Sequence, residues 1–338
     1  MRRVECSRCG VKVEKVPWAD GKHSCCNAYR QFLSRWARLL SWKDTAVCFR
    51  TSWDNVRRSV EWVVAYGLKH RDISGVEAIG VDEVAYKKGH KYLTLIYQID
   101  QGSKRLLGVV KDRKTSSLEG FFNECGLEWC RAIKVVCSDM WKPYLDVVSR
   151  MLPLALNVLD RFHIAKKLGE AVDSVRRDEA ARLRDDGYEP VLTKSRYCFL
   201  KRPTNLTPRQ SDQLGALLQY DLKTVRAYCL KESFDAFWQY NSPRWAQWFL
   251  RKWCARAMRS RLEPMKKFVR TLRAHEDLLM NYFKAGKTYS SGVVEGLNLR
   301  VKLGMRKAYG YRSFNLLQVS LFHTLGDLPE PDFPHRFC

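Results

Sequence analysis

The chain has 338 residues, of which 46% are hydrophobic, and its 60 Lys and Arg against 36 Asp and Glu give a formal net charge of +24. This composition excludes a disordered chain, allows two or three domains with a sizeable core, and favours a polyanionic partner, because each phosphate that Lys or Arg neutralises releases counterions. The sequence lacks both a run of about 18 apolar residues and the apolar core of a signal peptide, so it indicates a cytoplasmic protein with no membrane span.

The N-terminal segment is rich in cysteine. Cys6 and Cys9 have the two-residue spacing of a zinc knuckle. The candidates for the remaining zinc ligands are His23, Cys25 and Cys26. Unpaired structural cysteines are the alternative, because a lone CxxC is a weak signal, and the cysteines elsewhere are scattered and expected to be reduced. We therefore expect residues 1–29 to form a partial zinc-ribbon-like segment, with Cys6 and Cys9 as candidate ligands of Zn²⁺.

Residues 30–71 have the pattern of a helical DNA-binding module. The apolar residues of "AYRQFLSRWARLL" recur at the spacing of one helix face. The following "SWKDTAVCF", "RTS" and "WDNVRRSVEWVVAYG" predict a helix, a turn and a helix, with Ser52 as the N-cap. This is the outline of a helix-turn-helix, whose second helix would present Trp53, Asp54, Asn55, Arg57 and Arg58 to the major groove of DNA. An ordinary helical bundle is the alternative, but the excess of basic residues favours DNA.

From residue 72 the apolar spacing changes from that of helices to that of strands. Residues 78–86, 91–100 and 105–112 predict three consecutive strands with short turns, hence antiparallel neighbours. The elements expected next are a helix at 116–126, a strand at 132–139, a helix at 142–152 and a strand at 155–160. Three antiparallel strands followed by alternating helices and strands describe an α/β sheet of the ribonuclease H type. Residues 72–164 are therefore expected to form the first part of an RNase H-like core.

The rest of the chain is predicted to be helical apart from its end. Residues 165–286 are expected to form an all-helical insertion into the core. Residues 287–326 are expected to form the last part of the core, and the proline-rich residues 327–338 an irregular tail.

One part of the expected insertion combines basic and aromatic residues. Residues 251–273 contain nine Lys and Arg and one Glu, which favours a track for a phosphate backbone over a solvated helix face. Trp245 and Trp248 share one helix stripe with Phe249 and Lys252, so we predict that they pack into the core rather than stack on unpaired bases.

Three acids stand at expected strand or helix positions. Asp82 lies near the middle of the first strand, and Asp139 lies at the end of the fourth. In a sheet of this connectivity the two strands are neighbours, so the two carboxylates can converge. Glu295 lies on a helix, capped by Ser290 or Ser291, that could pack across the same edge of the sheet.

Converging carboxylates raise one another's pKa unless cations lie between them. Hard oxygen ligands of this kind suit Mg²⁺ or Mn²⁺, and two such ions about 4 Å apart activate a nucleophile and stabilise the leaving oxygen in phosphodiester chemistry. The alternative is that Asp82 ends its strand early and Glu83 points to solvent, as strand alternation demands of one member of the pair.

Four ordered motifs resemble a known family. "IGVDEVAYKKGHKYLTLIYQID", "VCSDMWKPY", "LDRFHIAKKLGEAVDSVRRDE" and "SSGVVEGLNLRVKLGMRKAYGYRSF" are similar to segments of DDE transposases of bacterial insertion sequences, most closely the ISL-three family, over about residues 1–323. The resemblance implies that Asp82, Asp139 and Glu295 hold the D, D and E positions with two Mg²⁺ or Mn²⁺ ions. It also implies cleavage and rejoining of double-stranded DNA at the terminal inverted repeats and in the target, by a homo-oligomer associated with the nucleoid.

Other residues are expected to support this chemistry. "LDRFH" resembles the D/C-x-x-H signature of related transposases, which implies that Asp160 and His163 lie beside the site and order a phosphate or help a proton transfer. A histidine bonded to local backbone is the alternative for His163. Glu295, Asn298 and Lys302 fall on one helix face. The basic residues after Glu295 that we expect to grip DNA are Arg300, Lys302, Arg306, Lys307 and Arg312.

The N-terminus is shorter than the family pattern, so an internal start or a truncated element is expected. A truncated, non-catalytic DNA-binding repressor of transposition is therefore one rival function. A structure-selective nuclease on the same fold is another. A serine recombinase is disfavoured, because no motif places an activated serine beside an arginine cluster.

Overall fold

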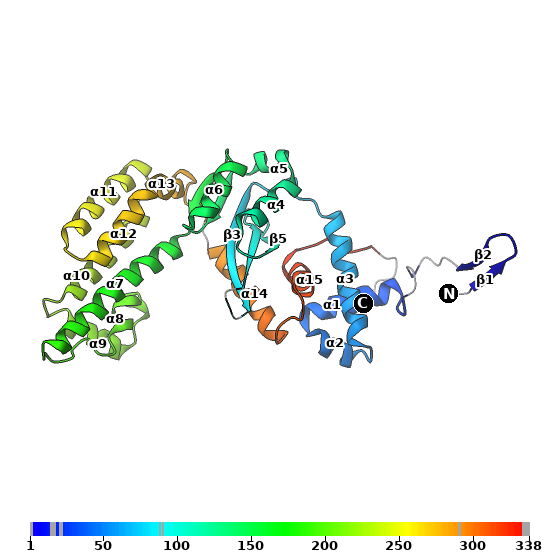
Figure 1. Ribbon diagram of the computed structural model, residues 1–338, viewed down its shortest axis with the longest axis horizontal. Coiled ribbons are helices and arrows are strands. Elements are labelled where there is room, and N and C mark those ends of the chain that lie inside the picture. The colour runs from blue at the N-terminus through cyan, green and yellow to red at the C-terminus, as the bar shows by residue number, and fades with distance from the viewer. Residues whose placement is uncertain are drawn as a thin grey trace. The chain divides into compact units, whose positions relative to one another are not determined.

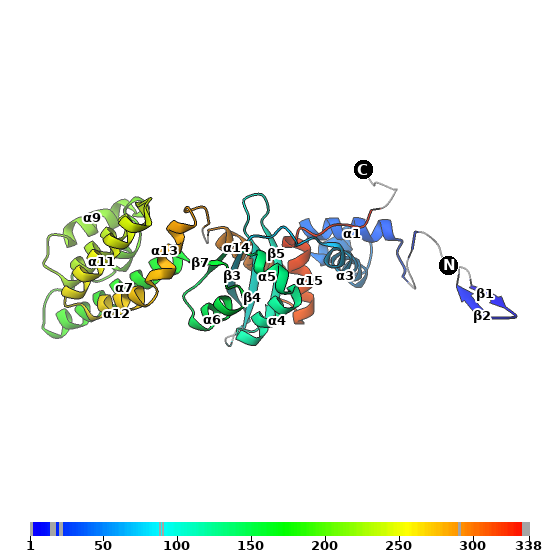
Figure 2. The ribbon, with the colours of Figure 1, turned by 90° about the horizontal axis from the view of Figure 1, so that it is seen from above.

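The computed structural model describes residues 3–13, 18–19, 23–87, 89, 91–289 and 292–332. The chain divides into two compact units, of which the first comprises Met1–Ala132 and Gly292–Cys338 and the second Ile133–Ser291. Their helices and strands are drawn in Figure 1 and, turned by 90°, in Figure 2.

The first unit begins with a short hairpin and three helices. Strands β1 (Arg3–Cys6) and β2 (Gly10–Val13) pair antiparallel. Helices α1 (Asn27–Leu39), α2 (Trp42–Cys48) and α3 (Trp53–His70) follow. The hydroxyl of Ser52 accepts the backbone N–H of Asn55, which confirms the predicted N-cap of α3. The helices of the expected helix-turn-helix are therefore present, with a buried valine face on α3.

The same unit contains an antiparallel sheet of three strands, β3 (Ala78–Lys87), β4 (Lys91–Gln98) and β5 (Arg105–Lys111). These are the three consecutive strands expected from the sequence. In their register Gly80 lies opposite Tyr97, and Asp82 lies opposite Leu95. Because β3 continues to Lys87, Asp82 is in the middle of the strand, and the alternative that it ends a strand early is wrong.

Four helices accompany this sheet within the first unit. Helix α4 (Thr115–Cys125) ends at Gly126, whose φ of +87° suits glycine, and α5 (Leu127–Ala132) follows. Helix α14 (Gly292–Lys307) packs against β3, and α15 (Phe314–Leu325) packs against β5 and α3 (Figures 1 and 2). The predicted caps Ser290 and Ser291 lie outside the described residues. Residues 327–332, the described part of the expected irregular tail, contain no helix or strand.

The second unit begins with two parallel strands, β6 (Val135–Ser138) and β7 (Leu156–Leu159). Helix α6 (Lys142–Met151) connects them, as a parallel pair requires a crossover. Helix α13 (Glu276–Lys284) packs against β7, where the amide of Asn281 donates to the carbonyl of Asn157 at 2.9 Å. The predicted fourth and fifth strands are thereby confirmed.

The rest of the second unit is helical, as predicted. Its elements are α7 (Arg161–Asp185), α8 (Arg196–Leu200), α9 (Pro208–Leu217), α10 (Lys223–Phe234), α11 (Pro243–Arg259) and α12 (Glu263–Ala274), with short 3₁₀ turns at Pro203–Asn205 and Asp235–Gln239. Their shared core includes the buried rings of Phe199, Phe234, Phe237 and Trp253. The chain is thus a mixed α/β protein. Within the described ranges, no helix is long and apolar enough to cross a membrane.

The predicted burial of two tryptophans in α11 is wrong. Trp245 is 58% exposed and Trp248 is 46% exposed. The helix instead turns Ala246, Leu250 and Trp253 into the core, a stripe at steps of four and three on its other side. Phe249 packs partly against that core, as expected.

Candidate active site

Asp82 projects from the face of β3 that α14 covers. Side chains alternate along a strand, so Gly80 and Asp82 point to the same face, and Glu83 points to the other. The carboxylate of Asp82 accepts the backbone N–H of Glu83 at 2.7 Å on Oδ1 and the side-chain amide of Asn298 at 2.5 Å on Oδ2. Two N–H donors of known position therefore hold this half-buried carboxylate in one orientation.

Asn298 connects the strand to the helix through a second hydrogen bond. The hydroxyl of Tyr97 on β4 donates to Oδ1 of Asn298 at 2.8 Å. Burial, and then the negative charge of Asp82, raise the pKa of Tyr97, so its hydroxyl keeps its proton and acts as the donor. Because Tyr97 must donate and Asp82 must accept, the orientation of the Asn298 amide is fixed. The sequence analysis placed Asn298 on the same helix face as Glu295 but gave it no role. It did not identify Tyr97 as a residue of the site, and the only signal that could have done so is the register of the hairpin.

Glu295 lies in the first turn of α14, one turn before Asn298. Residues three apart on a helix are neighbours, with Cβ atoms about 5–6 Å apart. The side chain of Glu295 is exposed, whereas Asn298 is buried. The close approach of α14 to β3 depends on Gly80, because a Cβ there would lie 2.4 Å from Cγ2 of Val294. The first unit therefore brings the predicted Asp82 and Glu295 to the same strand–helix contact.

Glu83 has a different environment from Asp82. Its carboxylate pairs with the guanidinium of Arg113 at 2.6 Å on the other face of the sheet. Only 13% of the Glu83 side chain is exposed, so its carboxylate lies in an ion pair and does not extend freely into solvent. The two adjacent acids that stood out in the sequence therefore have separate surroundings.

In the second unit, Asp139 and Asp160 lie at the carboxyl ends of neighbouring parallel strands. Asp139 follows β6, and its Oδ1 accepts the backbone N–H of Trp141 at 2.8 Å. Asp160 follows β7, and its backbone N–H donates to the carbonyl of Ser138 at 2.8 Å. Since parallel strands end at the same edge of a sheet, the two acids are adjacent there. The structure thus brings together two of the predicted site residues that are 21 positions apart in the sequence.

Asp160 also caps α7 and holds His163. Its Oδ1 accepts the N–H of Phe162 at 2.7 Å, and its Oδ2 lies 3.2 Å from Nδ1 of His163. Asp160 is 6% exposed, and the side chain of His163 is 27% exposed. Burial, with the nearby Asp160, also raises the pKa of the Cys137 thiol to about 12, so that thiol is neutral. A carboxylate that orients an imidazole is an arrangement used in general acid–base catalysis.

The metal-binding expectation concerns acids from both units. Among the residues that the structure describes, no group of three or more His, Cys, Asp or Glu side chains is gathered closely enough to hold an ion. The convergence of Asp82, Asp139 and Glu295 therefore stays a prediction.

The candidate zinc ligands Cys6 and Cys9 lie at the turn of the β1–β2 hairpin. Hydrogen bonds, first from the backbone N–H of Arg8 and then from Cys9, lower the pKa of Cys6. The hydrogen bond to Cys6 raises the pKa of the Cys9 thiol. A turn that directs N–H groups at a thiolate favours metal binding, but zinc itself stays a prediction.

The candidate DNA-reading residues Asn55, Arg57 and Arg58 of α3 already have hydrogen-bond or ion-pair partners within the protein. The guanidinium of Arg57 pairs with Asp54 and with Glu61, each at 2.6 Å, and Arg58 pairs with Asp54 at 2.8 Å. Asn55 donates to Thr51 and accepts from Ser24. The indole of Trp53 is 42% exposed. Contacts of Arg57 or Asn55 with DNA bases would replace these bonds.

Of the basic residues after Glu295, most are exposed on or just beyond α14. Lys302 and Arg306 are exposed, and the ammonium of Lys307 donates to the carbonyl of Leu39 at the end of α1. Arg312 lines a hollow of about 390 Å³, together with Lys87 and Tyr309. This part of the first unit therefore presents positive charge beside the helix that carries Glu295.

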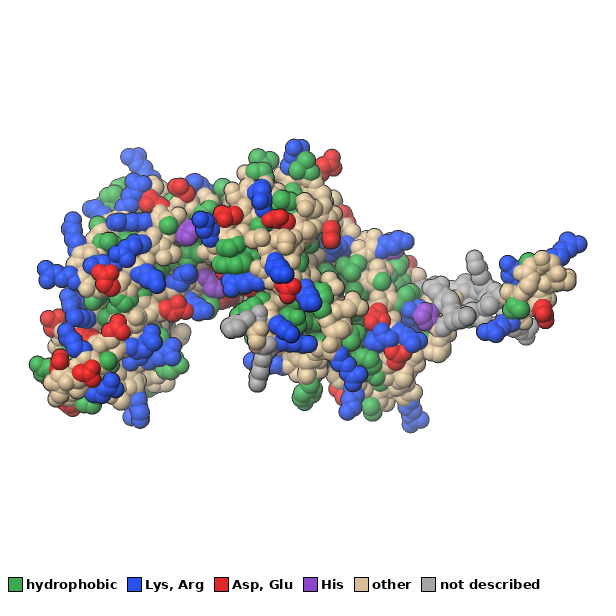
Figure 3. Space-filling model, viewed as in Figure 1, with side chains coloured by type: hydrophobic (Ala, Val, Ile, Leu, Met, Phe, Trp, Pro, Cys, Tyr) green, Lys and Arg blue, Asp and Glu red, His purple; other side chains and the backbone are tan. Residues whose placement is uncertain are grey.

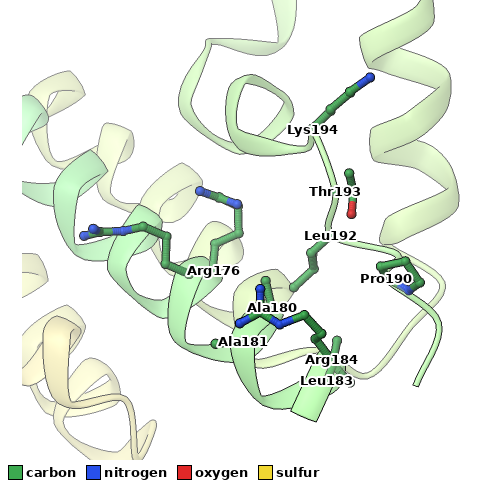
Figure 4. Close-up of a pocket in the computed structure, with 10 residues that line it drawn as sticks. Arg176, Ala180, Ala181, Leu183, Arg184, Pro190, Leu192, Thr193 and Lys194 are labelled. Carbon is green, nitrogen blue, oxygen red and sulfur yellow. The ribbon is translucent and has the colours of Figure 1, made fainter. Parts of the chain in front are cut away.

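A basic pocket of about 330 Å³ lies in the second unit (Figure 4). Its lining residues are Arg176, Arg177, Ala180, Ala181, Leu183, Arg184, Pro190, Leu192, Thr193 and Lys194. Arg176 is 16 residues after Asp160 on α7, which corresponds to about 24 Å of helix. The pocket is thus separate from the two acids of this unit.

Comparison with known families and proteins agrees with the motifs. A family model described as a transposase, of the ISL-three group, matches residues 79–321. The transposase of insertion sequence element IS1001 from Bordetella parapertussis is 27% identical over 314 residues, which is 92% of this chain and 76% of that protein. The transposase of element IS1557 from Mycobacterium tuberculosis is 30% identical over 359 residues, which is 99% of this chain and 79% of that protein.

Proposed function

The chain belongs to the ISL-three family of insertion-sequence transposases, and we propose that it binds the terminal inverted repeats of its element and cuts and rejoins DNA there with the help of divalent metal ions. The family supports a DNA-processing enzyme. The DNA sites, the residues and the order of the steps are the parts that we propose.

One observation carries the proposal most directly. The amide of Asn298 on α14 donates to the carboxylate of Asp82 on β3, and Glu295 lies one helical turn before Asn298. Asp82 and Glu295 are 213 residues apart in the sequence, yet a single side chain joins their elements. This arrangement supports Asp82 and Glu295 as two members of the acidic triplet, and we propose Asp139 as the third.

The donor atoms of these residues fit a hard divalent cation. Carboxylate oxygens are preferred by Mg²⁺ and Mn²⁺, and Asp82, Asp139 and Glu295 would supply them. Bound ions would supply polarisation of a water molecule and neutralisation of charge on the leaving oxygen. The family uses divalent metals in general. The number of ions, which we expect to be two, belongs to the proposal.

The reaction that we propose has two steps. Water attacks the phosphodiester at the end of the element, so a new phosphorus–oxygen bond forms and the bond to the 3′-oxygen breaks. The freed 3′-hydroxyl then attacks a phosphodiester of the target DNA, so that a new phosphorus–oxygen bond forms, the bond from that phosphorus to the target's own 3′-oxygen breaks, and the target's 3′-hydroxyl leaves. We propose that His163, oriented by Asp160 at 3.2 Å, orders the scissile phosphate or accepts a proton from the attacking group.

Recognition of the element is proposed for the N-terminal helices and for α14. Helix α3 would read the repeat with Trp53, Asn55, Arg57 and Arg58. The residues of and after α14 that would contact phosphates are Lys302, Arg306, Lys307 and Arg312. We propose a homo-oligomer in the DNA complex, because two ends must be joined, and a Zn²⁺ ion bound by Cys6 and Cys9.

The test is cleavage of a labelled duplex that carries the element's terminal repeat, in Mg²⁺ or Mn²⁺, by wild type and Glu295→Gln. The variant should bind the repeat as tightly as wild type in EDTA, because the amide keeps the shape of the exposed side chain. It should lose more cutting than the roughly 10- to 100-fold typical of outer partners of a metal site.

Glu83→Gln is the matched control. This substitution changes the residue next to Asp82 in the chain, but its side chain lies on the other face of the sheet. The Glu83→Gln variant should therefore still cut the terminal repeat. Equal cutting by Glu295→Gln and wild type would refute the assignment. Binding of the repeat without cutting by wild type would favour a non-catalytic DNA-binding repressor. Equal cutting of random duplexes would favour a nuclease.

A further inference from the structure

Helix α11 carries an exposed surface that combines two tryptophans with basic residues. We name this the α11 surface and define it as Trp245, Trp248, Lys252, Arg256 and Arg259. On a helix these positions fall on one side, opposite the buried stripe of Ala246, Leu250 and Trp253. The α11 surface therefore lies outside the core that α11 helps to build.

The two indoles are fixed in place although they are exposed. Trp245 and Trp248 meet edge to face, with ring centroids 5.8 Å apart and planes at 82°. The ammonium of Lys252 lies 3.9 Å from the centroid of Trp248. Edge-to-face aromatic pairs and cation–π contacts are both attractive, because the positive ring edge or the cation meets the negative face of a ring. The α11 surface thus presents ordered aromatic rings to solvent at little cost in side-chain freedom.

The charge of α11 restricts the partner. Its 17 residues contain five Lys and Arg and no Asp or Glu. Arg251 pairs with Glu276 of α13, and Arg256 donates to the hydroxyl of Ser233, whereas Lys252 and Arg259 are exposed. Figure 3 shows Lys and Arg side chains spread over the visible face of the second unit, with fewer acidic ones among them. The positive charge of α11 therefore favours a negatively charged partner.

The exposed indole rings favour single-stranded DNA over duplex DNA as the anionic partner. In duplex DNA the faces of the bases are buried in the stack, so a duplex would contact the cations and leave the two indoles without a partner. A single strand offers both phosphates for the cations and unstacked bases for the rings. We propose that the α11 surface binds single-stranded DNA, with a base stacked on Trp245 or Trp248 and phosphates on Lys252 and Arg259.

This inference rests on the proposed function only in taking the polymer to be DNA. Strand cleavage at the end of an element leaves a strand end whose bases can unpair, and a site for unpaired bases would hold such an end. The α11 surface contains none of the proposed metal ligands. Binding can therefore be measured in EDTA, apart from any cutting.

The experiment measures the affinity of the full chain for a labelled oligo-dT and for a duplex of the same length, by fluorescence anisotropy in EDTA at fixed salt. Alanine replacement of an aromatic platform typically weakens binding of a stacked base substantially. We expect Trp245→Ala and Trp248→Ala each to weaken oligo-dT binding about tenfold and to change duplex binding less than twofold. Trp248→Phe, which keeps a ring, should retain most of the affinity.

Tyr188→Ala is the matched control, because it removes a side chain that is 65% exposed in the same unit, and it should bind like wild type. Unchanged oligo-dT binding by the tryptophan variants would overturn the proposal. An equal loss for single strand and duplex would also overturn it, because the surface would then contact only the backbone. A wild-type dimer that Trp245→Ala converts to a monomer would assign the surface to a second copy of this chain.

A selective loss for oligo-dT supports the inference whether or not the protein cuts the terminal repeat. Loss of cutting in Glu295→Gln supports the proposed function whether or not the tryptophan variants bind oligo-dT normally. The two results are therefore independent of each other.

Discussion

Replacement of Gly80 by alanine should disturb the contact between β3 and α14 on which the candidate active site depends. An added Cβ would lie 2.4 Å from Cγ2 of Val294 and 3.4 Å from Cγ2 of Ile99. Carbon atoms in contact prefer about 3.5–4.0 Å, so α14 or β3 must shift by roughly 1 Å. Overpacking of this kind costs about 1–3 kcal/mol of unfolding free energy. The shift also moves Glu295, the next residue after Val294, and a displacement of about 1 Å can reduce a rate about 100-fold.

Val294→Ala provides the compensating change. It removes the clashing methyl, and the nearest remaining Val294 atom to the new Cβ is its own Cβ at 3.7 Å, an ordinary contact. Alone, Val294→Ala should cost about 1.6 kcal/mol or more, because it deletes two buried carbons. The double variant should be more stable than the sum of the two single effects by about 1–3 kcal/mol, since each change relieves the other.

Urea unfolding of the two single variants and the double variant measures this coupling, and cleavage of the terminal repeat measures its effect on activity. Gly120→Ala is the control, because nothing lies within 4 Å of a Cβ in the middle of α4. It should stabilise the chain by about 0.5–1 kcal/mol. Additive effects of Gly80→Ala and Val294→Ala, or a Gly80→Ala variant as stable and active as wild type, would show that the reasoning about this contact is wrong.

Two further predictions concern stability. Glu179 is 4% exposed, and its carboxylate accepts hydrogen bonds from the backbone N–H groups of Lys223 and Thr224 at the start of α10. Glu179→Ala should therefore lower the unfolding free energy, measured in urea, by about 3 kcal/mol. Replacement of the exposed Glu189 by alanine is the control and should change it by less than about 0.5 kcal/mol. Burial, and then the charge of Arg38, lower the pKa of His323 from 6.5 to about 3. Between pH 6.5 and about pH 3 this histidine is therefore protonated in the unfolded chain but not in the folded one. The unfolding free energy consequently falls as the pH is lowered through this range. At pH 5 the loss relative to pH 8 should be about 2 kcal/mol, and a His323→Gln variant that keeps the same slope of unfolding free energy against pH would contradict this origin.

The secondary structure could be predicted because it depends on local periods in the sequence. The alternation of apolar residues identified β3, β4 and β5, and the spacing of three and four residues identified the helices. Ser52 was recognised as an N-cap because a hydroxyl before an amphipathic run satisfies a backbone N–H of the first turn. The family motifs also directed attention to Asp82, Asp139 and Glu295 without any knowledge of their contacts.

The side of a helix that is buried could not be predicted from the same periods. In α1 the apolar Leu39 is 70% exposed, whereas Gln31 is 9% exposed. The reason is Glu330, whose carboxylate accepts a hydrogen bond from Gln31 and pairs with Arg35. Although burial raises the pKa of Glu330, hydrogen bonds from Arg35 and Gln31 lower it overall, so the carboxylate stays charged. A polar stripe is buried here because a distant acid satisfies it.

The exposed tryptophans of α11 have a similar explanation. Trp245 and Trp253 are both large and apolar, and each lies on a helix stripe with other apolar residues. Only the packed neighbours of α11 decide that Trp253, whose indole N–H donates to the carbonyl of Leu230, is buried while Trp245 is exposed. Periodicity gives the relative angle between two side chains, but it does not give the direction of the core.

The sequence by itself indicated the family and most of the helices and strands, and it supplied a prediction of the acids that a transposase of this kind would use. Only the tertiary structure decided that Asn298 bonds to Asp82 and Tyr97, that Glu83 faces Arg113 instead, and that Gly80 allows Val294 to approach. The physical reason is the separation in sequence between the residues that interact. Helix and strand periods arise from bonds between residues a few positions apart, whereas a hydrogen bond that joins residues 216 positions apart exists only after the chain has folded.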